Sequence, residues 1–229
     1  MAIVAGDRGA PFARSQTPLF AASGRDGGAI IEWPAGATTG FVSGPALTLR
    51  LLRLEDEARI LAAIEEYGQD DDSPMVFFEE ELRDDYIAYV KRLEAWVEGR
   101  EVPEGFVPNT FFVGVVGDQV VGRISIRHEL NDFLARLGGH IGYVVVPSHR
   151  GKGYATEMMR QALVYCRSLG LERVLLTCDA DNPASRRVIL KSGGVLDAVV
   201  EDPELRVPKE RYWIGIGKEI PEMDPVSAS

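Results

Sequence analysis

The pattern of apolar and polar positions predicts ordered structure from about residue 46 to residue 217. A first strand is expected over residues 47–52, where apolar side chains dominate. Two helical segments follow, one opening near Glu55 and a longer one over residues 79–97. In both segments the apolar side chains recur at helical spacing and form one stripe.

The second half of the chain alternates strands with helices. Further strands are expected over 110–116, 119–127, 140–146, 173–178, 195–200 and 212–216, and helices over 156–169 and 184–191. Turn residues separate these segments, as at Gly117, Pro147 and Gly170. The order predicts an α/β protein of the α+β type, with a mixed central sheet of about seven strands flanked by helices.

The chain divides by composition into three parts. Residues 1–45 are rich in small and turn-forming residues and lack periodicity, which is typical of a flexible N-terminal extension. Residues 46–217 form the expected domain, and residues 218–229 are expected to be a C-terminal tail. A chain of 229 residues can bury one substantial core without a second domain.

Composition favours a cytoplasmic protein. Apolar residues make up 45% and charged residues 26%, and no apolar run approaches the roughly 20 residues that span a bilayer. The N-terminus lacks the pattern of a secretory signal. Cys166 and Cys178 lie in apolar stretches and are expected to be buried free thiols. No spacing of cysteine and histidine indicates a metal site.

The net charge of −10 argues against nucleic acid as a partner, because phosphate binding needs clustered basic residues. An acidic surface instead attracts cationic molecules such as amines.

The segment from Val144 to Ala155 joins a β-branched strand to a glycine-rich turn and a helix start. Such a turn brings backbone N–H groups close to a diphosphate, and the helix dipole adds partial positive charge. Its Arg150, Gly153 and Ala155 resemble the R/Q-x-x-G-x-G/A signature of the GNAT acetyltransferase superfamily, whose loop grips the pyrophosphate of acetyl-coenzyme A. The resemblance implies a cofactor site formed by Val144, Val145, Val146, Arg150, Gly151, Lys152, Gly153, Tyr154, Ala155 and Thr156.

Downstream residues extend this resemblance over about residues 46–217. Asn182 is a good helix N-cap, and at this place an Asn of the superfamily contacts the pantetheine arm, with Ser185 nearby. The runs from Arg123 to Leu130 and from Gly138 to Gly142 are similar to a group of predicted acetyltransferases whose substrates are poorly defined.

The resemblance implies transfer of an acetyl group from acetyl-CoA to a primary amine of a small molecule or peptide, directly within a ternary complex. An amine with a pKa near 10.4 must lose its proton, which costs about 4.6 kcal/mol at pH 7. His140 is the candidate base and Glu129 the next. Backbone N–H groups of residues 144–146 would polarise the thioester carbonyl.

One position departs from the superfamily pattern, because Ile189 stands where many members place a tyrosine acid. Ser185 or a backbone N–H would then stabilise the departing thiolate. This departure keeps an alternative open, a catalytically weak or inactive module that binds acyl-CoA as a sensor or partner domain. Either form would act as a monomer or homodimer.

Overall fold

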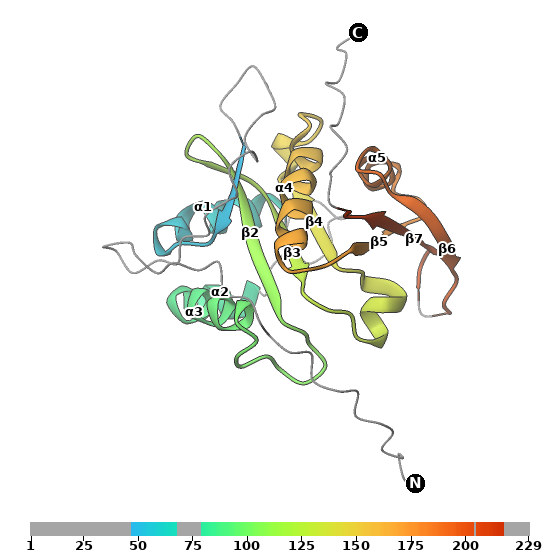
Figure 1. Cartoon of the computed structure of the whole chain (residues 1–229). Helices are drawn as coiled ribbons and strands as arrows, with labels where there is room; N and C mark the ends of the chain where they lie inside the picture. The colour runs from blue at the N-terminus through green and yellow to red at the C-terminus, as the bar shows by residue number, and fades with distance from the viewer. Residues whose placement is uncertain (1–46, 68–78, 204, 218–229) are drawn as a thin grey trace. The chain divides into compact units, whose positions relative to one another are not determined.

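The computed structural model describes residues 47–67, 79–203 and 205–217, all within the second of two units, Trp33–Ser229. The predicted extension and tail lie outside these residues. Seven strands are described: β1 (Thr48–Leu51), β2 (Asn109–Val116), β3 (Gln119–Arg127), β4 (Ile141–Val145), β5 (Arg173–Asp179), β6 (Val195–Val200) and β7 (Lys209–Gly215). The α-helices are α1 (Glu57–Tyr67), α2 (Glu79–Asp84), α3 (Tyr86–Val97), α4 (Tyr154–Ser168) and α5 (Pro183–Lys191) (Figure 1).

The seven strands form two antiparallel sheets. One has the order β1-β2-β3-β4 and the other the order β5-β7-β6. The predicted fold class and strand positions are confirmed, but the single mixed sheet is divided in two. The division falls between β4 and β5, which form no ladder, and it leaves one edge of β4 unpaired by any described strand.

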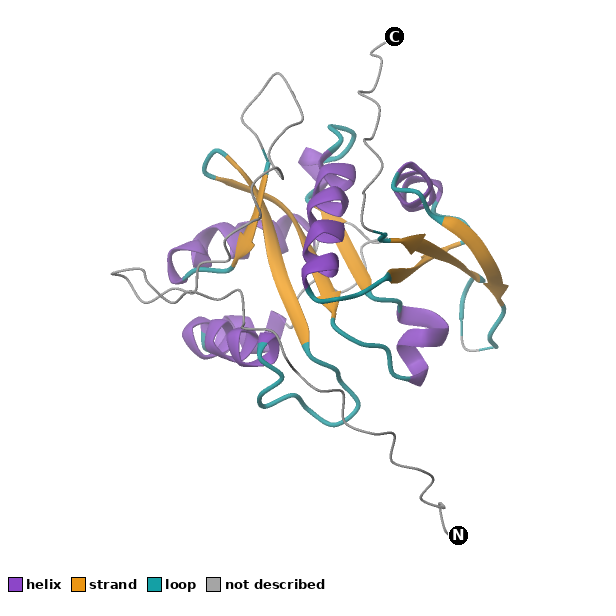
Figure 2. Cartoon of the chain, viewed as in Figure 1, coloured by secondary structure: helices purple, strands orange, loops and turns teal. Residues whose placement is uncertain are grey.

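Helices cover both faces of the four-stranded sheet (Figure 2). Helices α1 and α3 pack on one face over an apolar cluster, whereas α4 packs on the other. Met158 of α4 lies so close to β3 that a Cβ on Gly122 would come within 3.0 Å of its methyl carbon. Alternate residues of β3 and β4 therefore face α4, and the residues between them face α1 and α3.

The two sheets are joined at the start of β4. The backbone N–H of His140 donates to the carbonyl of Leu175 on β5 at 2.7 Å, and the Leu175 N–H donates back to Nδ1 of His140 at 2.9 Å. Gly139 makes this approach possible, since a Cβ there would lie 2.6 Å from the Leu175 carbonyl oxygen.

Three local features differ from the sequence prediction. The helix expected over residues 79–97 is broken at Asp85, whose extended backbone lets its side chain accept from the Ala88 N–H at 2.9 Å and begin a new helix. Strand β7 begins at Lys209 rather than at residue 212. A π-helical turn, Leu134–Gly138, was not predicted because one turn is too short to create periodicity.

Replacing Gly139 by Ala should destabilise the fold by about 2 kcal/mol or more, because the added methyl group meets a backbone oxygen and φ is +64°. Urea unfolding measures the loss. Gly117→Ala is the control, since φ there is +62° but nothing lies within 4 Å of a Cβ. Equal losses in the two variants would contradict a tight junction at Gly139.

Candidate active site

The glycine-rich turn forms an open cradle between β4 and α4. After a short 3-10 helix, Pro147–His149, the chain passes Gly151 at φ +77° and Gly153 at φ +80°. Nothing lies within 4 Å of a Cβ built at either glycine, so the space beside the backbone is clear. A ligand can therefore approach the main chain here more closely than a residue with a Cβ would allow.

Positive charge collects at this cradle. Gly153 caps α4 without a side-chain hydrogen bond, so the N–H groups of Tyr154, Ala155 and Thr156 have no acceptor within the helix. The exposed side chains of Arg150 and Lys152 stand directly before the cap. The cradle therefore suits an anion, and binding of a diphosphate there stays a prediction.

Two contacts fix the position of the turn. The Arg150 Nε donates to the carbonyl of Val145 at 3.3 Å. Glu66, near the end of α1, accepts from the N–H of Ser148 at 2.6 Å and from its hydroxyl at 3.1 Å. The turn is thus tied both to its own strand and to the helix on the opposite face of the sheet.

The unpaired edge of β4 carries backbone donors that face the division between the sheets. Val146 donates its N–H to Val121 on β3 at 2.9 Å, and His140 accepts from β3 at the other end. Because donors alternate along an antiparallel strand, Val144 also points toward β3, whereas Tyr143 and Val145 point the other way. Of the three valines predicted as carbonyl donors, Val145 alone has its N–H on the open edge.

A pair of hydroxyl groups, one from α5 and one from β4, joins the helix to the strand. Asn182 caps the helix by accepting from the Ser185 N–H at 2.9 Å, so the predicted cap is present. The Tyr143 hydroxyl lies 2.8 Å from the Ser185 Oγ. Burial raises the pKa of Tyr143 to about 12, so this hydroxyl keeps its proton at neutral pH. The sequence alone does not reveal this pair, because the contact of Tyr143 with α5 depends on the tertiary fold.

His140 is buried at the junction of the sheets. Its Nδ1 accepts from Leu175, so in the neutral ring the proton is on Nε2. Burial, with a further contribution from the Arg127 charge, lowers the pKa of His140 to about 4. Its predicted role as a base remains a prediction, and the structure restricts it, because the nitrogen that is not bonded to Leu175 already carries a proton.

The second candidate base, Glu129, and its neighbour His128 follow the end of β3. Glu129 is exposed, two residues beyond the end of β3. His128 takes part in a buried network in which the Thr110 hydroxyl lies 2.8 Å from its Nε2 and 2.9 Å from the Tyr165 hydroxyl. Burial lowers the pKa of His128 to about 4. The network links β2 and α4 to the residue that directly follows β3.

Neither a metal-ion cluster nor a helix able to span a membrane occurs among the described residues. No cluster of three or more His, Cys, Asp or Glu side chains suited to a metal ion occurs among them. None of the helices in this part of the chain has both the length and the apolar character needed to cross a membrane.

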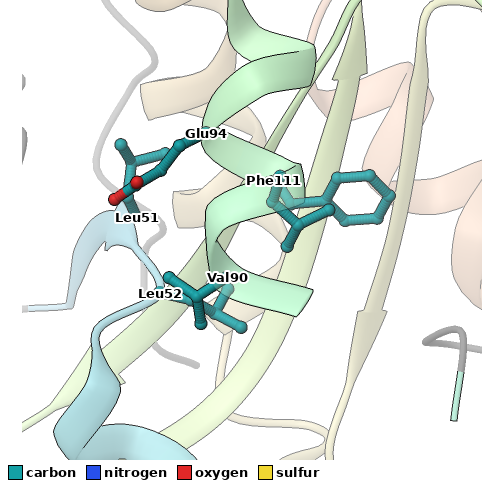
Figure 3. A pocket seen from close by; sticks show the side chains of 6 residues that line it. Leu51, Leu52, Val90, Glu94 and Phe111 are labelled. Atoms are coloured by element: carbon teal, nitrogen blue, oxygen red, sulfur yellow. The ribbon is translucent and has the colours of Figure 1, made fainter. Parts of the chain in front are cut away.

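A small pocket lies away from the candidate site (Figure 3). It is bordered by β1, β2 and α3 and is apolar apart from Glu94, so it offers no reactive group. The lining residues are Leu51, Leu52, Val90, Leu93, Glu94 and Phe111.

Residues 46–195 match the model of the acetyltransferase (GNAT) domain. Because this match covers more than half of the chain, the protein belongs to the GNAT acetyltransferase family.

Curated relatives show local similarity. The chain is 36% identical over 91 residues to the ribosomal-protein-serine acetyltransferase of Escherichia coli (strain K12). The aligned segment covers 38% of this chain and 48% of that protein. It is 32% identical over 78 residues to the uncharacterized N-acetyltransferase YoaA of Bacillus subtilis (strain 168), and this segment covers 29% of this chain and 44% of that protein. The chain thus spans less than half the length of these relatives.

Solved structures share the fold. Mycobacterium smegmatis RimJ in complex with CoA-disulfide aligns with a TM-score of 0.57 at 21% identity, covering 77% of this chain and 85% of that one. The microcin C7 self-immunity acetyltransferase MccE, solved with acetyl-CoA and AMP, aligns with a TM-score of 0.56 at 17% identity, covering 74% and 92%.

Folding stability should fall between pH 7 and pH 5, because His128 and His140 must stay neutral in the fold. The unfolded chain takes up protons below a pKa of 6.5, whereas the folded chain takes them up only near pH 4. Stability present above pH 6.5 is therefore lost as the pH falls toward 4, by about 2 kcal/mol per histidine at pH 5.

Urea unfolding of the wild type and of His140→Asn at both pH values measures the share of His140. The variant should lose less stability on acidification, by about 2 kcal/mol. An identical pH dependence in the two proteins would show that His140 titrates normally in the fold.

Proposed function

We propose that this protein transfers an acetyl group from acetyl-CoA to a primary amine of a small molecule or peptide, directly within a ternary complex. The observation that carries the proposal is the open cradle at Gly151 and Gly153, which continues into the unpaired edge of β4. An anion site followed by a row of free backbone donors fits a diphosphate that continues into an amide-containing arm.

The residues present fit this cofactor. Gly151, Gly153 and the first N–H groups of α4 would hold the diphosphate, with Arg150 and Lys152 adding charge. The edge of β4 would pair with the arm, as a peptide adds a strand to a sheet. Acetyl-CoA, when bound, supplies the activated acyl group.

Backbone N–H groups on the open edge of β4 would polarise the thioester carbonyl. Tyr143 and Val145 direct their N–H groups there, and rigid donors of this kind stabilise charge on an oxygen without reorganising. Because these N–H groups are held in the strand, no side-chain donor is needed to polarise the carbonyl.

The hydroxyl pair of Tyr143 and Ser185 would hold a proton for the departing thiol. The two oxygens lie 2.8 Å apart, so Ser185 can donate to the thiolate while Tyr143 donates to Ser185, and the proton that the amine loses returns to Tyr143 through water. A thiolate with a pKa near 8.5 needs only a modest donor at neutral pH. This pair can therefore serve where the superfamily tyrosine is replaced by Ile189.

Removal of the amine proton is assigned to His140, with Glu129 as the second candidate and solvent as the carrier. Because Nε2 already carries a proton, His140 could accept another only at Nδ1, after the hydrogen bond from the Leu175 N–H breaks, and it would then release that proton to water. A pKa of about 4 makes this ring a weak base, which supports entry of the acceptor as the already neutral amine.

Gly153→Ala should weaken acetyl-CoA binding at least tenfold, because the added methyl group occupies the space meant for the diphosphate. Calorimetric titration with acetyl-CoA measures this change. Gly170→Ala is the matched control at the other end of α4, with φ +81° against +80° and the same open surroundings. Both variants should lose about 1 kcal/mol of stability, and an equal loss of affinity in both would reject the cradle.

Ser185→Ala should lower kcat about 10- to 100-fold, because the thiolate loses a nearby donor. The assay is release of free thiol with an amine acceptor. Ser192→Ala, at the other end of α5 with its hydroxyl bonded to the Val188 carbonyl at 2.8 Å, should leave kcat unchanged. An undiminished rate in Ser185→Ala would remove this residue from the reaction.

A binding module without turnover is the second candidate, and the buried Ile189 in the tyrosine position favours it. Acetyl-CoA binding with no thiol release on any amine would support this reading. As further proposals, the protein works in the cytosol as a monomer or homodimer and binds neither nucleic acid nor membrane. The free thiols of Cys166 and Cys178 and the net charge of −10 support these proposals.

A further inference from the structure

Arg127 places a cation on the face of β4 that is turned away from α4. It is the last residue of β3, and its guanidinium reaches across the neighbouring strand to Gly142. A Cβ on Gly142 would lie 3.1 Å from Nη1 and 3.4 Å from Nη2. The absence of a side chain at Gly142 therefore creates the space in which this charged group lies.

Among the described residues, this guanidinium has no carboxylate partner of the kind that Arg50 and Arg186 have. Arg50 makes two hydrogen bonds to Asp56, and Arg186 makes two to Glu210. Arg127, half-buried, makes one long hydrogen bond, from Nη1 to the Gly138 carbonyl at 3.4 Å, and forms an ion pair with no acidic side chain in the described ranges. Burial lowers the pKa of Arg127, and no negative charge raises it.

A half-buried cation without a counterion is costly, and a guanidinium has five N–H donors to satisfy. The Ser125 hydroxyl lies on the same face, 3.3 Å from the point where a Cβ on Gly142 would be, but it donates to the Gly142 carbonyl. Arg127 thus offers a planar pair of donors whose best partner is a carboxylate.

The position of Arg127 relates it to the acyl acceptor rather than to the cofactor. The cradle and the Tyr143–Ser185 pair lie on the α4 and α5 side of β4, whereas Gly142 faces the opposite side. A nucleophile must approach the thioester from the side that the cofactor does not fill. Gly142 directly precedes Tyr143 and stands about 10 Å along the strand from Val145, since a strand rises about 3.4 Å per residue.

We propose that Arg127 is a specificity-determining residue that binds a carboxylate of the acceptor, so that the acceptor is an amino acid or a similar small molecule with an amine and a carboxylate. This inference rests on the acetyl transfer proposed above. Tyr143, the nearer of the two proposed backbone donors, directly follows Gly142, so the spacing suits an amine and a carboxylate separated by a few bonds. The positive charge of Arg127 also explains how an acidic protein attracts a substrate that carries both charges.

The test uses pairs of acceptors that differ only in charge: α-, β- and γ-amino acids and their carboxamides. The wild type should acetylate at least one acid with a kcat/KM about 10- to 100-fold above that of its amide, as expected for charge-assisted hydrogen bonds. Arg127→Met should abolish this preference while its affinity for acetyl-CoA stays unchanged. Arg100→Met, which removes an exposed guanidinium paired only with Glu98, should keep the preference.

Arg127→Lys tests whether the planar donor pair of the guanidinium is needed. It also replaces Arg127→Met in the assay if the melting temperature of Arg127→Met shows that this variant does not fold. Lysine keeps the charge but loses the planar donor pair, so KM for the acid should rise about tenfold with little change in kcat. A preference that survives in both variants, or a wild type that treats acids and amides alike, would overturn the proposal and leave acetyl transfer standing.

A binding measurement separates failure of this proposal from failure of the proposed function. If the wild type binds acetyl-CoA but acetylates nothing, each amino acid is titrated into the CoA complex of the wild type and of Arg127→Met. Binding to the wild type alone would support the carboxylate site without turnover. Equal binding, or no binding to either protein, would reject it.

Discussion

The reciprocal pair between His140 and Leu175 is the constraint on which the candidate site depends. It joins the two sheets at one point, where a backbone N–H and a ring nitrogen replace the ladder that would otherwise continue. Because pairing stops there, β4 keeps a free edge. A side chain that closes one end of the junction thus leaves donors available for a ligand along the rest.

Glycines have two different uses around this junction. Gly139 lets two backbones touch, and Gly142 leaves room for an arginine side chain, so both permit contacts within the protein. Gly151 and Gly153 have empty surroundings and permit a contact that the protein itself does not make. This contrast separates glycines that permit a contact within the protein from glycines that leave space for a ligand.

Local charge opposes the overall charge of the molecule. The chain carries −10 in total, yet Arg150, Lys152 and Arg127 gather around β4 on its two sides. Under the two proposals, these three cations would bind anionic groups of two different ligands in a protein whose net charge is negative. The net negative charge would favour the approach of a cationic amine.

Periodicity predicted the strands and most of the helices, and glycines close together in the chain predicted an open turn between β4 and α4, because these features depend on residues near one another in the sequence. The sequence also indicated Asn182 as a cap, which is a contact across three residues. The tertiary structure alone decided that the sheet divides at β4, that Val145 rather than Val144 directs its N–H to the open edge, and that Tyr143 meets Ser185. The same holds for the hydrogen bond that restricts His140 and for the place of Arg127 over Gly142. Each of these depends on strand register and on contacts between residues far apart in the chain, and no local pattern records them.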